Sequence, residues 1–331
     1  VLLVLILCWF ANVSTVAVAQ PDLSLELTQK TREQVVIAVQ TFSPKGDTKD
    51  PAGLADEHRA ILENDLRLSE YFILAQRATF HDVELSDRHS STVDYLTWHR
   101  LGVQWFIKAE YEINPKNKTF SVVFRLFDAS NERFLFGKQY TGTIDSARKI
   151  SCRFADEVVE QLTGKRGVAE TRIAFVSKQS GFKEIYLVDF DGYNVERLTK
   201  DDSVSLSPAW SPTGKKIIYT SYAERNPDLM MIDVFNKRRK PILRLPGLNA
   251  APAWSSDGVK IALVLSKDSN SEIYVLDKNM ELTRLTHHFN IDTSPAWSPN
   301  GKQIAFTYDR SGTGVPQVYI MDAQKGDEAK V

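Results

Sequence analysis

The sequence predicts an α/β domain followed by an all-β propeller. The propeller is indicated by a phrase that occurs three times, with its tryptophans, Trp210, Trp254 and Trp297, 44 and then 43 positions apart. A repeat of about 40–45 residues that contains several short strands is typical of propeller blades. The α/β domain is indicated by helix and strand patterns that follow one another between residues 20 and 165.

The composition is that of an ordinary globular protein, and with the net charge and the cysteine count it excludes several classes of protein. Of the 331 residues, 43% are hydrophobic and 25% are charged. The formal net charge of -1 gives no electrostatic footprint for nucleic acid or for an anionic membrane surface. The cysteines are Cys8 and Cys152, so a disulfide framework is excluded once a leader that contains Cys8 is removed.

Residues 1–19 have the pattern of a targeting segment. Residues 1–10 are almost wholly apolar, and they lead through Ala17, Val18 and Ala19 to Gln20. An apolar core before a small-x-small site is typical of a secretory signal peptide. We therefore expect an incomplete signal peptide over residues 1–19 and an exported mature chain that begins at Gln20. No second long apolar segment follows, so we expect no transmembrane segment in the mature chain.

The α/β domain begins with a strand, a helix and a second strand. Residues 34–42 are rich in β-branched side chains and predict a buried strand. Asp50 and Pro51 predict the start of a helix, with Asp at the N-cap and Pro at the first helical position. Residues 71–74 predict a short strand. Together these elements favour a right-handed parallel crossover.

The rest of this domain adds helices and an antiparallel meander. Residues 92–101 predict a helix, and residues 146–163 predict another, which ends at Gly164. Between them lie three strands with short connections, at residues 103–113, 120–128 and 134–140. We therefore expect a mixed sheet with helices over residues 20–165.

The repeated phrase is Pro-Ala-Trp-Ser, at residues 208–211, 252–255 and 295–298, and a turn containing Gly follows each copy. The turn reverses one strand into the next, and the tryptophan supplies a large apolar plate between sheets. A first blade begins at residues 171–177 without the phrase. Because blades bury their faces only against neighbours, we expect a propeller over residues 166–331, with four visible blades, an incomplete last blade and a longer parent protein.

Specific stretches carry a resemblance to a known family. They are Gln-Leu-Thr-Gly-Lys-Arg-Gly at residues 161–167, Thr-Arg-Ile-Ala-Phe-Val at 171–176 and Asp-Phe-Asp-Gly-Tyr-Asn at 189–194, together with the three phrases. With these stretches the chain resembles the TolB family of the periplasmic Tol-Pal system. The resemblance implies a six-bladed propeller, of which about four blades are visible. It also implies a non-enzymatic adaptor that links the outer-membrane lipoprotein Pal to the TolA–TolQ–TolR complex, supports outer-membrane integrity and division, and is a target of some bacteriocins.

The resemblance also implies where partners bind. Pal is expected at the mouth of the propeller channel, where the chain crosses from the outer strand of one blade to the inner strand of the next. The expected residues lie in loops just before each phrase, namely Ser205, Leu206, Ser207, Asn249, Ala250, Ala251, Asp292, Thr293 and Ser294. TolA is expected on the mature N-terminus, at Gln20, Pro21, Asp22, Leu23, Ser24 and Leu25. Further outer-membrane partners and a monomeric protein are also expected.

The sequence contains no strong catalytic motif. It has no Gly-x-Ser-x-Gly elbow, P-loop or dinucleotide fingerprint. His287 and His288 have no Cys or third His at a ligand spacing, which favours a solvated loop over a metal site. Cys152 lies near a helix start, where a thiolate is favoured, yet a passive thiol is the preferred interpretation. Four acidic residues match no calcium loop and favour turn capping: Asp189, Asp191, Asp201 and Asp202. We expect no metal, no cofactor and no enzymatic activity.

Two alternatives to the adaptor remain open at this point. The first is the propeller of a prolyl-oligopeptidase-like serine peptidase, with its hydrolase domain beyond Val331. The second is a sugar- or metal-binding lyase propeller, which requires inward-facing His clusters that the predicted inner strands lack. Sequence beyond Val331 distinguishes the peptidase from the adaptor, because only the peptidase continues into a nucleophile elbow.

Overall fold

The computed structural model describes residues 34–50, 52–88, 93–308 and 315–330. The chain from residue 34 onward forms one compact unit. The signal peptide expected over residues 1–19 and the TolA-binding segment expected over residues 20–25 lie outside the described residues, as does Pro51.

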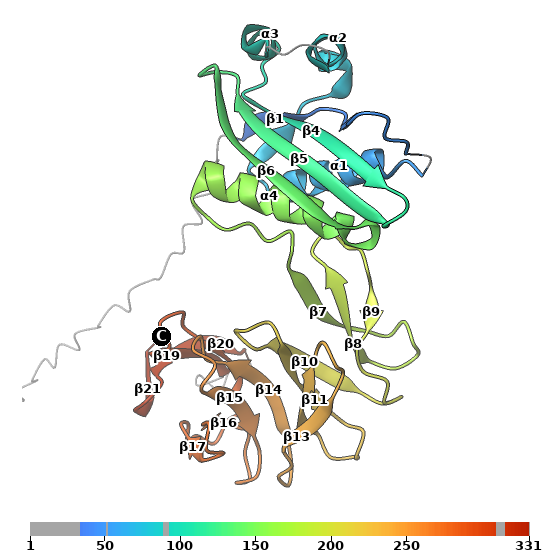
Figure 1. The fold of residues 1–331 in the computed structure, drawn as a ribbon. Helices are drawn as coiled ribbons and strands as arrows, with labels where there is room; N and C mark the ends of the chain where they lie inside the picture. Colours follow the sequence, from blue (N-terminus) through green and yellow to red (C-terminus); the bar gives the residue numbers. More distant parts are fainter. Residues whose placement is uncertain (1–33, 51, 89–92, 309–314, 331) are drawn as a thin grey trace, which may run out of the picture. The chain divides into compact units, whose positions relative to one another are not determined.

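A mixed six-stranded sheet forms the centre of the N-terminal region (Figure 1). Its strands are β1 (Val35–Val39), β2 (Ser43–Pro44), β3 (Phe72–Leu74), β4 (Trp105–Asn114), β5 (Thr119–Asp128) and β6 (Arg133–Thr143). β1 pairs in parallel with β3 and with β4, while β4, β5 and β6 are antiparallel neighbours and β2 pairs with β4. The predicted mixed sheet, with its parallel crossover and antiparallel meander, is confirmed.

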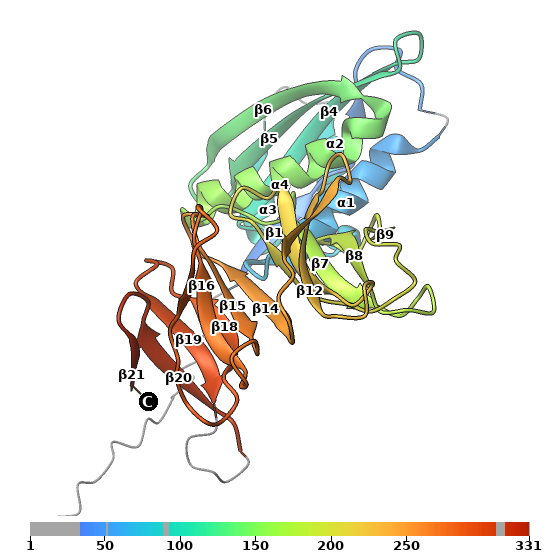
Figure 2. The ribbon, with the colours of Figure 1, turned by 90° about the horizontal axis from the view of Figure 1, so that it is seen from below.

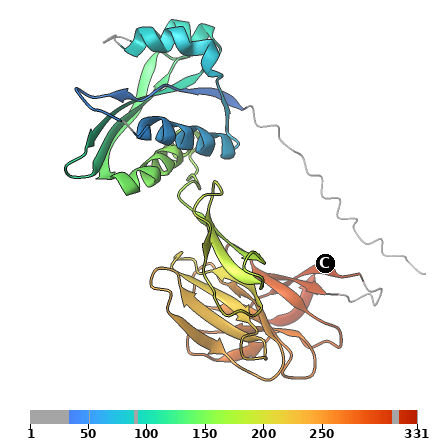
Figure 3. The ribbon, with the colours of Figure 1, turned by 90° about the vertical axis from the view of Figure 1, so that its right-hand side faces the viewer.

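Helices cover both faces of this sheet. They are α1 (Leu54–Leu68), α2 (Arg77–Arg88), α3 (Tyr95–Arg100), the 3-10 turn η1 (Ile144–Ser146) and α4 (Ala147–Thr163). α1 and α4 lie side by side on one face (Figure 3), where Phe124 and Phe154 stack at 4.3 Å between ring centroids. α2 and α3 cover the other face, where Trp98 stacks on Phe106 at 4.6 Å. Ile37 belongs to the first core and the adjacent Ala38 to the second, as the pleat of a strand requires.

The helix ends test the predictions about capping. α4 is followed by Gly164 in the left-handed conformation, with φ 71°, as predicted. The start predicted for α1 is wrong, because the helix begins at Leu54 and its N-cap residue is Gly53. The Asp50 carboxylate nevertheless accepts hydrogen bonds from the backbone N–H groups of Leu54 at 2.9 Å and Ala55 at 2.8 Å. Asp50 therefore caps the helix from outside it.

Four antiparallel sheets beyond residue 171 are the predicted blades (Figures 1 and 2). Blade 1 contains β7 (Arg172–Ser177), β8 (Glu184–Asp189) and β9 (Glu196–Arg197), and blade 2 contains β10 (Ser205–Trp210), β11 (Lys216–Ser221), β12 (Asp228–Asp233) and β13 (Arg239–Leu243). Blade 3 contains β14 (Asn249–Trp254), β15 (Ile261–Leu265), β16 (Glu272–Leu276) and β17 (Leu282–Arg284), and blade 4 contains β18 (Thr293–Trp297), β19 (Gln303–Tyr308), β20 (Gln317–Asp322) and β21 (Gly326–Lys330). Blade 1 lacks the strand that carries the phrase, as predicted. The expectation of an incomplete fourth blade is wrong, because β21 supplies its fourth strand.

The phrase plays the structural role expected of it. β10, β14 and β18, which we call the inner strands, each end at the tryptophan of one copy, and a tight turn follows. The turn glycine Gly214 has φ 66°, and its counterparts Gly258 and Gly301 have φ 71° and 68°. Trp297 Nε1 donates a hydrogen bond to the carbonyl of Ala253 in the preceding blade at 3.1 Å. Each of the three tryptophans packs against buried apolar side chains of its own blade and of the preceding one, so it joins neighbouring sheets by apolar contact, as predicted.

Candidate partner-binding site

The inner strands begin where the chain arrives from the preceding blade. These crossings are residues 198–204, 244–248 and 285–292. Because blades 2, 3 and 4 repeat one strand order and neighbouring inner strands are in contact, the crossings lie at the same edge of the propeller. We call this edge, made of the three crossings and the first three residues of each inner strand, the rim.

The structure corrects the local structure predicted for the rim. The residues before each phrase were expected in loops, but β10 begins at Ser205, β14 at Asn249 and β18 at Thr293, which leaves only Asp292 in a crossing. Ser205, Asn249 and Asp292 are also buried. The other predicted residues are half-buried or exposed, and these are Leu206, Ser207, Ala250, Ala251, Thr293 and Ser294.

A bulge in each inner strand explains how the strand passes the proline of the phrase. The register with the next strand shifts just before the proline in all three blades. At the shift, Ser207, Ala251 and Ser294 have φ of 52°, 47° and 55°, which is uncommon for residues other than glycine. A bulge leaves a residue unpaired and bends the strand, and proline is tolerated there because it has no N–H to pair. The strand therefore continues through a region that was predicted as loop.

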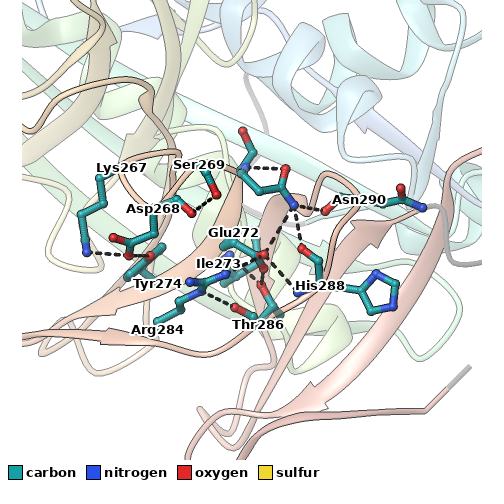
Figure 4. A network of polar contacts seen from close by, with 12 residues as sticks. Lys267, Asp268, Ser269, Glu272, Ile273, Tyr274, Arg284, Thr286, His288 and Asn290 are labelled. Carbon is teal, nitrogen blue, oxygen red and sulfur yellow. Dashed lines mark hydrogen bonds and ion pairs between the residues drawn. The ribbon is translucent and has the colours of Figure 1, made fainter.

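A buried carboxylate holds the crossing between blades 3 and 4 (Figure 4). Glu272, the first residue of β16, is fully buried. It accepts hydrogen bonds from Thr286 Oγ1 at 2.6 Å, from Arg284 Nη2 at 2.9 Å and from the backbone N–H of His288 at 3.0 Å. Because burying a carboxylate costs free energy unless its oxygens are paired, these contacts favour one path for the crossing.

The same arrangement recurs in blade 1. Glu184, the first residue of β8, is fully buried and contacts Thr199 and Arg197, the latter at 2.9 Å. It also accepts hydrogen bonds from the backbone N–H groups of Asp201 and Asp202, both at 2.9 Å. The first crossing is therefore held by the same chemistry as the third.

The second crossing, between blades 2 and 3, is also held by polar contacts, but by different residues. Asp228, the first residue of β12, is buried and lies 3.3 Å from the guanidinium of Arg244. The Asn249 side chain donates to the carbonyls of Leu245 at 2.7 Å and Gly247 at 3.2 Å. An amide thus holds the second crossing, alongside the acid–arginine pair.

The crossing before blade 4 is also tied to the neighbouring loop. Asn270 Nδ2 donates to the carbonyls of His288 at 2.8 Å and Asn290 at 2.5 Å (Figure 4). These contacts, which the sequence analysis did not predict, restrain the backbone of the crossing. The contacts of the two buried glutamates do have a signal in the sequence, which is the repeat of Glu-Ile-Tyr followed by Arg-Leu-Thr at residues 184–199 and again at 272–286.

Two exposed apolar side chains stand on the crossing before β18, and sequence reasoning missed them as well. Phe289 is 79% exposed and Ile291 is 63% exposed. The adjacent His288 ring lies 4.4 Å from that of Phe289 and contacts the Tyr308 hydroxyl through Nδ1. Large apolar residues on a braced backbone are typical anchors of protein–protein interfaces.

The titratable groups beside the rim are engaged with one another. The ammonium of Lys267 lies 2.6 Å from the Asp268 carboxylate, and this contact lowers the pKa of Asp268. The Tyr274 hydroxyl donates to the same carboxylate at 2.5 Å, and burial raises the pKa of Tyr274. Among the residues that the structure describes, no group of three His, Cys, Asp or Glu side chains could hold a metal ion.

Cys152 lies away from the rim and is buried. Burial, with Asp65 nearby, raises the pKa of its thiol, so it fits the passive thiol that was predicted. In the described part of the chain, no helix is both long and apolar enough to cross a membrane.

Comparisons with known proteins agree with the two-part organisation. The family model described as "TolB amino-terminal domain" matches residues 23–135, and the one described as "TolB beta propeller domain" matches residues 159–331. A crystal structure of TolB from Acinetobacter baumannii superposes with a TM-score of 0.73 at 25% identity, covering 89% of this chain and 70% of that one.

Curated relatives extend the likeness. The Tol-Pal system protein TolB of Desulfosudis oleivorans is 36% identical over 73% of this chain and 55% of its own length. The protein of the same name from Bordetella parapertussis is 32% identical over 86% of this chain and 66% of its own length. The chain thus spans between about half and two thirds of the length of these relatives. The matches favour the predicted family over the peptidase and lyase alternatives.

Proposed function

The chain belongs to the TolB family, and on that premise we propose that it acts in the Tol-Pal system as a periplasmic adaptor whose rim binds the outer-membrane lipoprotein Pal. The observation that carries this proposal is the rim itself. The first and third crossings are held by buried glutamates, the second by Asn249 beside an acid–arginine pair, and the third exposes Phe289 and Ile291. A rigid edge with exposed apolar anchors supports binding of a folded partner.

The residues proposed to contact Pal are the accessible ones among those predicted. Leu206, Ala251 and Thr293 lie half-buried beside the bulges of the three inner strands. Ser205, Asn249 and Asp292 are buried. We therefore propose that they stabilise the rim and that their accessible neighbours contact Pal. Phe289 and Ile291 extend the proposed surface.

The other parts of the proposal rest on family membership. We propose that residues 20–25 bind TolA, that the protein is an exported monomer and that it supports outer-membrane integrity and cell division without enzymatic activity.

A charge placed on the rim tests the Pal site. Thr293→Lys should weaken Pal binding at least about tenfold, because it introduces a desolvated charge into the interface. Thr213→Lys is the matched control, since Thr213 is exposed in the turn after Trp210, at the end of β10 opposite the rim. Calorimetric titration with purified Pal measures both variants, and circular dichroism verifies their folding. Binding of wild-type strength by folded Thr293→Lys would contradict the assigned surface.

A further inference from the structure

The turn at residues 189–194 is a sequence motif that the proposed function does not use. Its sequence is Asp-Phe-Asp-Gly-Tyr-Asn, and it follows β8 in blade 1. We propose that this turn and Arg148 of α4 form a latch that fixes the α/β domain against the first blade, so that residues 34–331 move as one body. The inference is independent of which partner binds the rim.

The turn holds its two carboxylates in place with its own polar groups. The backbone N–H of Asp189 donates to the carbonyl of Tyr193 at 2.9 Å, which closes the turn. Asp189 Oδ2 accepts from Asn194 Nδ2 at 2.6 Å, and Asp191 Oδ1 accepts from the backbone N–H of Tyr193 at 3.2 Å. Gly192 and Asn194 have φ of 88° and 51°, values that these two residue types tolerate best. Both carboxylates are therefore held in position by contacts within the turn, independently of Arg148.

Arg148 reaches this turn from the first turn of α4. Its guanidinium contacts the Asp191 carboxylate directly and lies 3.8 Å from that of Asp189. It also lies 4.1 Å from the centroid of the Tyr193 ring, which is the geometry of a cation–π contact. The Arg148 side chain is 16% exposed and that of Asp191 only 6%, so solvent screens this pair less than an ordinary surface pair.

The position of Arg148 in its helix supports a role outside the helix. A cation in the first helical turn is unfavourable because the positive end of the helix dipole lies there, and that turn of α4 contains no acidic residue. A locally unfavourable residue is expected where a longer-range contact compensates for it. Asp189 and Asp191 provide that compensation.

A second attachment lies further along the same helix. The Asp156 carboxylate accepts hydrogen bonds from the backbone N–H groups of Ala169 at 2.7 Å and Glu170 at 3.1 Å. A Cβ atom on Gly167 would lie 2.5 Å from the Asp156 Cα atom, so the connecting segment passes directly against α4. Two attachments, one to the segment and one to the turn, oppose rotation of the blade about the connection.

Measurement of a distance between the two regions tests the latch. Spin labels at Arg67→Cys on α1 and Lys278→Cys in blade 3, two exposed positions, report this distance in the full chain. The background carries Cys8→Ser, and the buried Cys152 stays in place. We expect one narrow distance distribution for the parent protein. Arg148→Ala should replace it with a broader distribution that includes new distances.

Control variants make the result specific. Lys149→Ala removes the neighbouring exposed cation and should leave the distribution narrow. Arg148→Lys keeps the charge but loses the planar group that stacks on Tyr193, and its distribution should be intermediate in width. Should Arg148→Ala fail to fold, Asp191→Asn serves in its place, because it removes the charge and keeps the Oδ1 acceptor that shapes the turn. If Arg148→Ala, or Asp191→Asn in its place, gives a distance distribution as narrow as that of Lys149→Ala, the proposal is overturned.

Discussion

At the scale of single residues, the most consequential feature of the α/β core is a buried acid. Asp65 on α1 is 2% exposed, and neither of its carboxylate oxygens has a conventional hydrogen-bond donor among the described residues. Burial raises the pKa of Asp65 to about 6, and the Cys152 thiol opposes that rise only in part. No periodicity in the sequence distinguishes this Asp from the exposed acids of α1, because its protonation depends on α4 packing over it.

Asp65 should therefore make stability depend on pH. Its folded pKa lies above its ordinary value of 3.8, so the wild type should lose stability as pH rises from about 4 through 6, by up to about 3 kcal/mol. Asp65→Asn stays neutral and should be more stable than the wild type at pH 8 but not at pH 4. Urea unfolding at both pH values measures this, with the exposed Asp82→Asn as the control. If Asp65→Asn changed the free energy of unfolding equally at the two pH values, the raised pKa of Asp65 would be contradicted.

At the scale of elements, sequence patterns predicted what is apolar and regular. α4 and the strands of the meander were found because their buried residues are hydrophobic and evenly spaced. α2 was missed because two of its buried residues are acids, Glu84 and Asp87, which look polar in the sequence. Asp87 can be buried because its carboxylate accepts a hydrogen bond from the indole N–H of Trp98 at 2.8 Å. The starts of the inner strands were wrongly predicted as loop for a similar reason, since the bulges depend on contacts between strands.

The crossing before blade 4 should loosen when its acid is neutralised. Glu272→Gln weakens the contact with Arg284 and places an amide N–H against one of the donors that Glu272 now accepts from, which should cost about 1–3 kcal/mol of stability. Hydrogen exchange at the His288 amide, which donates to Glu272, should become faster than in the wild type. Glu281→Gln, at an exposed site of the same blade, should change neither quantity. Unchanged exchange at His288 in Glu272→Gln would show that the carboxylate does not hold the crossing.

At the scale of the whole molecule, the repeat of 44 and 43 residues predicted three blades, and the strand pattern at residues 171–177 predicted the first one. Neither could predict which rim residues are accessible. Ser205 and Ser207 are two positions apart, yet one is buried and the other exposed, because the bulge between β10 and its partner reorients the chain. The exposure of Phe289 and Ile291 could not be predicted from the sequence either. An exposed apolar residue suggests a binding surface only when the structure shows that it lies on the rim.

The central claim is that this edge binds Pal, and calorimetric titration of Pal into a variant that lacks both apolar anchors tests it most directly. The double variant Phe289→Ala and Ile291→Ala should bind Pal at least about tenfold more weakly, a loss of about 1.4 kcal/mol or more. The matched control is Phe235→Ala, which removes a side chain that is 72% exposed on the turn after β12, away from the rim. Wild-type affinity in the double variant, or an equal loss in Phe235→Ala, would contradict the claim.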